Sequence, residues 1–375
     1  MAEAPRKLKG HKSSTTCCIA SNHRPGFIAT SGEDGCVCLF DLRCKDVLFV
    51  MNVGDDPVTS LCFKQDNEDI IYVSSGNEVK SFDVHQAGSL KPLHNYSYNQ
   101  EEINQIVCSS KSSFIAAADD GGDVKIIDIR QHRPYKTLRN SHESICSTVQ
   151  FLPWRPWEVI TGGLDSKLIL WDFSKGRPLG ILDFGKPDVH SRGNAEQCCN
   201  PAFVHSIAVP QVDMLDRVGK ICVVGRGDGI VSVIDIESQF YPTKTKNLSK
   251  LQKNGQSRSK GSVSSSNTES QDQSRDKKLN IDYTSGGHTA AVSCVTLSTF
   301  GEKGKYIISG ANDKSVKAWN WSPHFDPCQT SNSDGLLHLN INLTRKVNWL
   351  CTAPSDSENL IICDTSKLVK VYTIA

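Results

Sequence analysis

Short runs of alternating apolar and polar residues, separated by turn residues, recur along this chain. Residues 145–153, 158–163 and 167–173 read ICSTVQFLP, EVITGG and KLILWDF. Each run has the two-residue period of a half-buried strand, and turn residues separate one run from the next. The pattern predicts three consecutive strands of a small antiparallel sheet.

The third of these strands belongs to a cassette that repeats. A Gly-Asp-type turn precedes a short β-branched strand that ends in an aromatic or aliphatic residue and then Asp. The four clearest copies are GEDGCVCLFD, DDGGDVKIID, GLDSKLILWD and RGDGIVSVID, which end at Asp41, Asp128, Asp172 and Asp235. A repeat of about 40 to 45 residues built from four-stranded units predicts a radial β-propeller.

Seven residues mark the end of the third strand in successive repeats: Phe40, Phe82, Ile127, Trp171, Ile234, Trp319 and Tyr372. The longer spacings after Trp171, Ile234 and Trp319 require insertions. We expect an inserted loop over residues 185–200, a disordered Ser/Lys-rich insert over 239–278, and a third insert after Trp321, because these stretches are too polar to bury a core.

The last repeat supplies only three strands, so the chain before residue 10 is expected to complete it. Residues 5–9 then form the outer strand of the final blade and close the ring, which removes its exposed edges. The prediction is an all-β, single seven-bladed propeller over residues 5–375. Its blades span about 10–50, 55–95, 100–140, 141–184, 200–285, 286–343, and 344–375 with 5–9.

The repeats resemble the WD-repeat family. The resemblance rests on Gly10-His11 with Phe40-Asp41, Ser141-His142 with Trp171-Asp172, and Gly287-His288 with Trp319-Asn320, whose His-to-aromatic spacings agree closely. In that family a turn aspartate, the histidine, a strand hydroxyl and the tryptophan form a buried hydrogen-bonded chain. The resemblance implies three such networks: His11, Ser31 and Asp34 with Phe40; His142, Thr161, Asp165 and Trp171; and His288, Ser309, Asp313 and Trp319.

A Ser-His-Asp set also suggests catalysis, but its recurrence at three equivalent positions favours a structural role. Phe40 has no indole N–H, so the first network is expected to be truncated. The second and seventh repeats lack most of these residues and are expected to depend on packing.

Residues 101–130, 143–172 and 345–350 resemble a narrower group within that family. This resemblance implies a substrate receptor for cullin-4 ubiquitin ligases, which docks on the ligase's propeller adaptor. In that class an arginine two residues after the repeat's aspartate marks the docking site, and Arg43 and Arg130 match it. Their repeats are not neighbours, and Phe40 and Ile127 replace the tryptophan. The alternative is that both arginines are solvated strand-end residues.

The fourth repeat adds two tryptophans in a proline-rich turn, Pro153-Trp154-Arg155-Pro156-Trp157. This turn is expected on the same face as Arg43 and Arg130, and rigid aromatic side chains there suit partner binding. Trp157 adjoins the second strand and is expected to be the more packed of the two; the alternative is that one of the tryptophans covers a blade edge.

Composition limits the partners, the location and the cofactors that the chain is expected to have. With 42 basic and 41 acidic residues, a nucleic-acid partner is disfavoured, and neither a signal peptide nor a membrane-spanning run is recognised. Most of the 15 cysteines lie in apolar strand patterns without CxxC spacing, which favours buried thiols, a reducing cytoplasmic or nuclear location, and no metal or cofactor.

Two classes of function remain. The first is a non-enzymatic scaffold, monomeric by itself, that binds the cullin-4 adaptor and an unknown client protein, or else a scaffold of another intracellular complex. The second is a propeller enzyme, which needs acids or histidines converging on the central channel, and the P-loop, HExxH and GxSxG motifs are all missing from the sequence.

Overall fold

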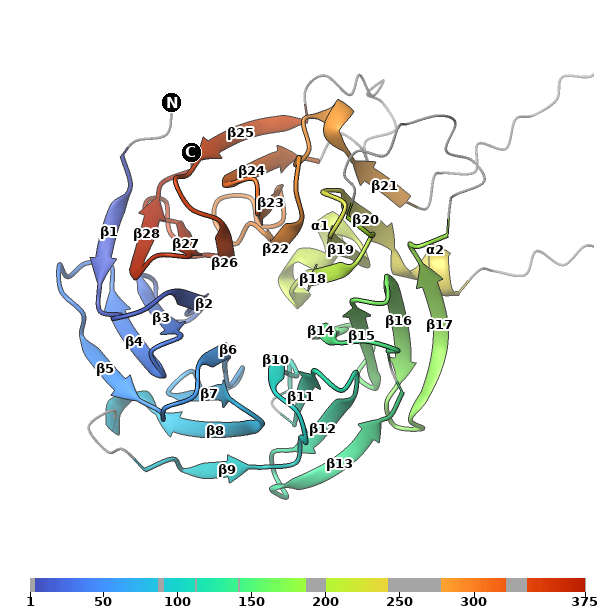
Figure 1. Cartoon of the computed structure of the whole chain (residues 1–375), viewed down its shortest axis with the longest axis horizontal. Helices are drawn as coiled ribbons and strands as arrows, with labels where there is room; N and C mark the ends of the chain where they lie inside the picture. The colour runs from blue at the N-terminus through green and yellow to red at the C-terminus, as the bar shows by residue number, and fades with distance from the viewer. Residues whose placement is uncertain are drawn as a thin grey trace, which may run out of the picture.

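The computed structural model describes residues 4–86, 91–111, 113–140, 142–186, 200–241, 278–321 and 336–374. Within these ranges the strands form seven four-stranded antiparallel sheets. The sheets are arranged as blades around a central axis, with the first strand of each blade innermost (Figure 1). The expected all-β, seven-bladed propeller is confirmed.

The first four blades each contain four consecutive strands. Blade one comprises β2 (Thr15–Ala20), β3 (Phe27–Gly32), β4 (Cys36–Asp41) and β5 (Phe49–Asn52). Blade two comprises β6 (Val58–Phe63), β7 (Ile70–Ser75), β8 (Glu78–Asp83) and β9 (His94–Tyr96). Blade three comprises β10 (Ile103–Cys108), β11 (Phe114–Asp119), β12 (Val124–Asp128) and β13 (Arg133–Leu138). Blade four comprises β14 (Cys146–Phe151), β15 (Glu158–Gly163), β16 (Lys167–Asp172) and β17 (Arg177–Asp183).

The remaining blades follow the same plan, and short helices lie in the connections. Blade five comprises β18 (Val204–Ala208), β19 (Ile221–Arg226), β20 (Val231–Asp235) and β21 (Lys278–Ile281). Blade six comprises β22 (Val292–Leu297), β23 (Tyr306–Ala311), β24 (Ser315–Asn320) and β25 (Leu337–Asn342). Blade seven comprises β26 (Val347–Thr352), β27 (Leu360–Asp364), β28 (Leu368–Tyr372) and β1 (Arg6–Lys9). The helical turns are η1 (Val84–Gln86), η2 (Val212–Met214), α1 (Leu215–Val218), α2 (Ile236–Phe240) and η3 (Tyr283–Ser285).

The N-terminal strand closes the ring as expected. β1 pairs antiparallel with β28, and the register places Arg6 opposite Val371 and Lys9 opposite Leu368. In Figure 1 the blue β1 lies beside the red β28. Leu8 is buried in an apolar cluster with Val369 of the same blade, so packing as well as ladder hydrogen bonds holds the strand.

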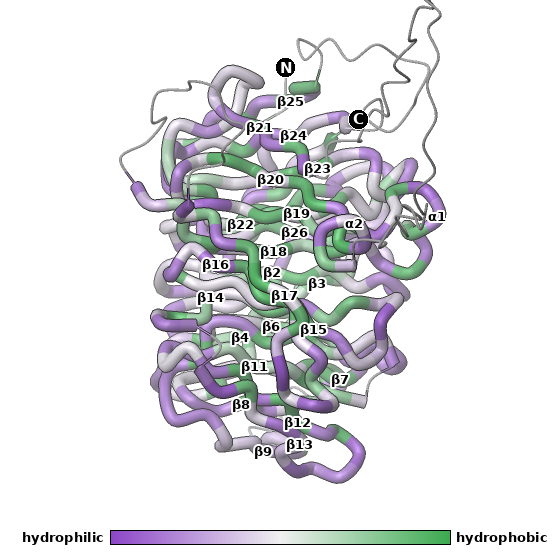
Figure 2. The backbone as a smooth tube through the Cα atoms, turned by 90° about the vertical axis from the view of Figure 1, so that its right-hand side faces the viewer, coloured by the Kyte–Doolittle hydropathy of each residue, from purple (hydrophilic) through white to green (hydrophobic). Residues whose placement is uncertain are grey.

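The apolar core lies between blades. One cluster, for example, combines Ala116 and Ile126 of blade three with Val149, Trp171 and Phe173 of blade four. Seen from the side, hydrophobic residues lie along the strands, and the loops at the two faces of the ring are mostly hydrophilic (Figure 2). Each blade therefore depends on its neighbours for burial of its apolar surface.

A polar residue near the start of the inner strands links neighbouring blades around the channel. Asn104 donates to the Cys146 carbonyl at 3.2 Å, and Asn348 donates to the Thr15 carbonyl at 2.7 Å. Hydroxyl groups make the same contact elsewhere, from Thr16 to Val58, from Thr59 to Ile103 and from Ser147 to Val204. These bonds fix the inner strands in one common orientation.

All connections between first and second strands, and between third and fourth strands, therefore open on one face. We call this the lower face and the opposite one the upper face. The helices α1 and α2, which lie in connections of these two kinds, are on the same side of the ring in Figure 2. Arg43, Arg130, Trp154 and Trp157 all lie in lower-face connections.

The long insert has different bounds from those predicted from the sequence. The insert expected over 239–278 overlaps α2, which continues to Phe240, and β21, which begins at Lys278. The Asp235 carboxylate caps α2 by accepting the Ser238 N–H, a start signal that strand patterns do not reveal. The rest of that insert, most of the 185–200 loop and the segment after Trp321 lie outside the described residues.

Candidate functional site

Arg43 lies on the aspartate that ends its own strand. The Arg43 backbone N–H donates to Asp41 Oδ1 at 2.9 Å, and the guanidinium contacts both carboxylate oxygens, with Nη2 2.6 Å from Oδ2. This hydrogen bond lowers the pKa of Asp41. The Arg43 side chain is still 79% exposed, so its remaining donors face solvent on the lower face.

Arg130 occupies the equivalent turn in blade three. Asp128 Oδ1 accepts the N–H groups of Arg130 and Gln131 at 2.9 and 3.0 Å. Unlike Arg43, Arg130 has no acidic partner for its guanidinium among the described residues. Blade two repeats the turn with His85, whose N–H donates to Asp83 and whose ring lies 2.9 Å from Asp69. His85 thus lies in the blade between the two arginines.

The Arg43 loop is also held from the N-terminal strand. Arg6 donates to the carbonyl oxygens of Leu42 and Cys44, which flank Arg43 in the chain. The same guanidinium pairs with Glu358 of blade seven at 3.0 Å. Arg6 was not among the site residues expected from the sequence, because only the ring closure brings it beside this loop.

The two tryptophans of the blade-four turn differ from the sequence expectation. Trp157 is the exposed one, at 47%, although it contacts Phe114 and Phe173. Trp154 is half-buried against the blade-four and blade-five cluster, and its indole N–H is buried without a hydrogen-bond partner among the described residues. The expectation that Trp157 would be the more packed is therefore wrong, because the turn folds Trp154 inward.

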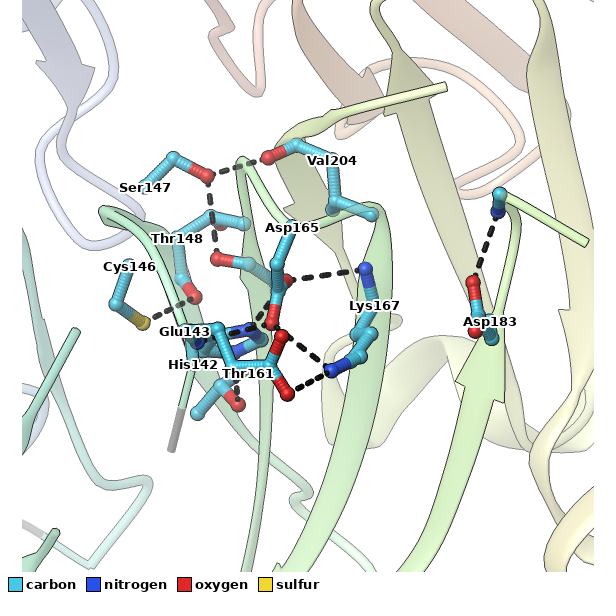
Figure 3. A network of polar contacts seen from close by, with 12 residues as sticks. His142, Glu143, Cys146, Ser147, Thr148, Thr161, Asp165, Lys167, Asp183 and Val204 are labelled. Atoms are coloured by element: carbon cyan, nitrogen blue, oxygen red, sulfur yellow. Dashed lines mark hydrogen bonds and ion pairs between the residues drawn. The ribbon is translucent and has the colours of Figure 1, made fainter. Parts of the chain in front are cut away.

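The complete histidine network lies in blade four. His142 Nδ1 lies 2.8 Å from Asp165 Oδ1, His142 Nε2 lies 2.9 Å from Thr161 Oγ1, and the Trp171 indole donates to Thr161 at 3.2 Å. Figure 3 shows Asp165 between His142 and Lys167. Burial raises the pKa of Asp165, but hydrogen bonds from His142 and the Glu143 backbone outweigh it and hold the pKa below its ordinary value.

The blade-one network uses a different strand residue from the one expected. His11 Nδ1 lies 3.1 Å from Asp34 Oδ1, but His11 Nε2 contacts Thr30 Oγ1 at 2.9 Å, and Ser31 instead bonds Thr16. Assigning Ser31 was therefore wrong by one residue. Successive strand residues face opposite sides of a sheet, so only Thr30 points toward His11. Phe40 is buried in the apolar cluster that blades one and seven share.

The blade-six network is complete except for its indole. His288 contacts Asp313 at 3.0 Å and Ser309 at 2.6 Å, and the Trp319 ring packs edge-on against the His288 ring. The Trp319 N–H, however, is buried without a hydrogen-bond partner among the described residues. Burial lowers the pKa of His288, and the carboxylate of Asp313 has a pKa well below its usual value because bonds from His288 and Ser315 overcome burial.

Other blades replace the histidine by different pairs that the repeat pattern did not predict. In blade three, Asn99 donates to Asp119 at 2.9 Å. In blade five, Arg226 pairs with Asp228 and lies over the Phe184 ring. In blade seven, Lys370 forms a buried ion pair with Asp364. In these three blades the pair satisfies a carboxylate that is buried or partly buried near the turn, which would otherwise be costly.

The geometry gives these histidines a structural role. Both ring nitrogens of His142 are engaged, and the side chain is buried together with Thr161, so a substrate has no access to a free nucleophile or base. Among the described residues, no three His, Cys, Asp or Glu side chains are placed to hold a metal ion. None of the helices in the described ranges has the length and apolar character needed to cross a membrane.

Comparison with known proteins agrees with this architecture. The family model "WD domain, G-beta repeat" matches residues 3–41, 133–172 and 280–320. WD repeat-containing protein 53 homolog of Dictyostelium discoideum is 32% identical over 62% of this chain and 65% of its own length. The human protein NEDD1 is 25% identical over 44% of this chain and 26% of its length, and the mouse nucleoporin Nup43 is 26% identical over 48% of each.

The chain thus spans less than two thirds of each of these relatives. The matched repeats cover the Gly-His and Trp-Asp positions of blades one, four and six, where the structure places the histidine networks. The seven four-stranded blades in the described residues, the histidine networks and the three matched repeats show that the chain is a β-propeller that contains WD repeats.

Proposed function

We propose that this chain is a non-enzymatic scaffold that acts as a substrate receptor of a cullin-4 ubiquitin ligase in the cytoplasm, the nucleus or both. The lower face binds the propeller adaptor of the ligase through Arg43 and Arg130, with Trp154 and Trp157 nearby. The upper face, or the insert between blades four and five, binds a client protein.

The observation that supports this proposal is the repeated Asp-x-Arg turn at the lower ends of β4 and β12. In both turns the aspartate accepts the arginine's N–H at 2.9 Å, so the backbone presents the two side chains in the same way. A guanidinium fork binds a carboxylate or several carbonyl oxygens at once, which suits docking on another protein. The two arginines are exposed and belong to the first and third blades of the ring.

The alternative is a WD-repeat scaffold of another intracellular complex. The similarity to a nucleoporin, which extends over 48% of this chain, favours that alternative over an enzyme. The two scaffold functions share the propeller surface and differ in the partner that the lower face binds.

Affinity purification from cell extract distinguishes them. The intact protein is compared with an Arg43→Ala/Arg130→Ala double variant and with Arg139→Ala, an exposed arginine beyond β13 on the upper face. The receptor function requires that the intact protein and Arg139→Ala capture the cullin-4 adaptor and that the folded double variant does not. Absence of the adaptor from the intact protein's eluate would exclude the receptor function, and the proteins recovered would then identify the alternative complex.

A further inference from the structure

Four aromatic rings gather on the lower face where blades three and four meet. Phe114 and Tyr135 come from blade three, and Trp157 and Phe173 come from blade four. Ring centroids are separated by 5.0 Å for Phe114–Tyr135, 5.9 Å for Phe114–Trp157 and 5.6 Å for Trp157–Phe173. We call this group the aromatic platform. Within the platform Phe173 is fully buried, whereas Trp157 and Tyr135 are 47% and 38% exposed.

A β-bulge in blade three positions Tyr135. Ile126 faces Lys136 and Ile127 faces Pro134, so Tyr135 is an extra residue in β13 and is directed onto Phe114. Blade six contains the same device: His338 is the bulged residue of β25 and stacks on Tyr306 at 4.7 Å. The contact between a bulged residue and the first ring of the second strand thus occurs in two blades. In blade three, Trp157 of the neighbouring blade adds a further exposed ring to it.

Three arginines at the lower ends of blades three and four have charges that no acidic side chain neutralises within the described part of the chain: Arg130, Arg133 and Arg177. By contrast, the other lower-face arginines pair with carboxylates, namely Arg6, Arg24, Arg43, Arg155 and Arg217. The strand register places Arg133 opposite Asp128, which itself faces Phe114. It places Arg177 in the row of Asp172 and Glu158, and Glu158 accepts from Tyr241, so Arg177 lies on the blade-five face of blade four.

The nearby carboxylates are already engaged. Asp172 pairs with Lys175 at 3.2 Å and accepts from Ser174, and Asp128 accepts two backbone N–H groups. Asp128 keeps its charge, but the arginines near the rings outnumber it, so the exposed aromatic rings are bordered by an excess of positive charge. An acidic ligand gains from this field, whereas a methylated lysine or another cation is repelled by it.

We infer that the aromatic platform binds an acidic peptide segment of a partner protein. An apolar side chain of that segment lies on Trp157 and Tyr135. Its carboxylates pair with Arg133 and Arg130 of blade three and, farther along the segment, with Arg177 at the lower end of blade four. Rigid Trp and Tyr rings beside arginines form the composition in which binding energy concentrates at interfaces. A single-stranded nucleic acid is less suited, because the rings lean on one another, with Trp157 and Tyr135 inclined by 31°, and the chain's net charge is only +1.

The inference rests on the proposed function in one respect, that the lower face binds proteins, and does not depend on the cullin-4 adaptor being the partner. It is tested with the full chain. Random peptides of about 12 residues, long enough to cross the platform when extended, are selected on phage for binding to the immobilised protein. The enriched peptides are then synthesised and titrated by fluorescence anisotropy.

Enriched peptides are expected to carry a net negative charge and at least one apolar residue, and to bind more weakly as salt is added. Trp157→Ala, and separately Arg133→Glu/Arg177→Glu, should weaken binding at least about tenfold. Matched controls are Ile181→Ala, an apolar residue of blade four that is 57% exposed, and Arg139→Glu on the upper face, and both should bind as the wild type does.

The charge-reversal variant keeps the inference testable if Trp157→Ala fails to fold, because both arginines are exposed. Failure to enrich peptides, enrichment of neutral or basic peptides, unchanged binding by Arg133→Glu/Arg177→Glu, or tighter binding of a uridine oligonucleotide would each overturn the inference. The variant leaves Arg43 and Arg130 intact. Adaptor capture by Arg133→Glu/Arg177→Glu thus reports on the proposed function separately from peptide binding.

Discussion

Arg6 and Arg43 are coupled through the backbone: the guanidinium of Arg6 donates to the carbonyl oxygens immediately before and after Arg43. The first strand of the chain therefore does more than complete the last blade. It also fixes the loop that presents one of the two proposed docking arginines, while Glu358 of blade seven holds Arg6 in place.

Replacing Arg6 by alanine should loosen this loop and weaken docking while the ring stays closed. Two carbonyl bonds and one partly exposed ion pair are lost, so we expect the free energy of unfolding to fall by about 1 kcal/mol. Amide hydrogen exchange of residues 42–47 should accelerate. Lys7→Ala, an exposed neighbour in β1, is the matched control. Unchanged exchange at Arg43 and Cys44 would show that Arg6 does not hold the loop.

Two tryptophans at equivalent positions should respond differently to the same substitution. Trp171 donates to Thr161, whereas the Trp319 N–H is buried without a partner in the described structure. Trp171→Phe should cost about 1–2 kcal/mol more unfolding free energy than Trp319→Phe, because only the former removes a hydrogen bond and leaves its acceptor less satisfied. Urea denaturation measures both. Equal losses would mean that ring packing, not the indole bond, stabilises the blade-four network.

Stability should fall as the solution becomes acidic, in two stages. Burial holds the pKa of His288 below 6.5, and the pKa values of His94 and His205 shift the same way, chiefly through burial. The native state therefore binds fewer protons than the unfolded chain as the pH falls through 6.5, so unfolding becomes easier.

The aspartates of the networks add the second stage. Asp34, Asp165 and Asp313 have pKa values below the ordinary 3.8, because hydrogen bonds from histidine and backbone groups outweigh burial. Their contribution is present above pH 3.8 and is lost as the pH falls through their native values. Melting temperature against pH measures both stages. A His288→Gln variant should flatten part of the first stage, and a wild-type melting temperature that stays constant from neutral pH down to about 5 would contradict it.

Cys44 should be the most reactive thiol of the described chain. Cys44 is the one exposed cysteine among the described residues. Burial raises the pKa values of the Cys17, Cys18 and Cys62 thiols well above the ordinary value of a cysteine thiol. A brief maleimide treatment followed by peptide mass spectrometry should label Cys44 first, and Cys17 and Cys18 should react only after unfolding. Comparable labelling of Cys17 and Cys44 in the native protein would mean that blade one opens.

The repeated blades of this fold could be predicted from the sequence, whereas the directions in which individual side chains point could not. The repeated cassette marks each blade, and the missing strand of the last repeat indicates that the N-terminal segment fills it. Choosing between Thr30 and Ser31 required knowing which face of β3 is turned toward His11. The sequence does not reveal this face, because β3 is buried on both sides. Likewise, the exposure of Trp157 depends on how a proline-rich turn folds, and the position of Tyr135 depends on a bulge that leaves no mark in the residue pattern.

Ring closure has a consequence for biosynthesis. Arg6 and its partner Glu358 are separated by 352 residues, and among the described strands β28 is the partner of β1. During translation β1 leaves the ribosome long before β28 exists, so the earlier blades must form while that strand has no partner. The strand that closes the ring is thus the first part of the ring to be synthesised and must be among the last to fold. A bulky fusion next to β1 would therefore slow the closure of the ring rather than destabilise the folded protein.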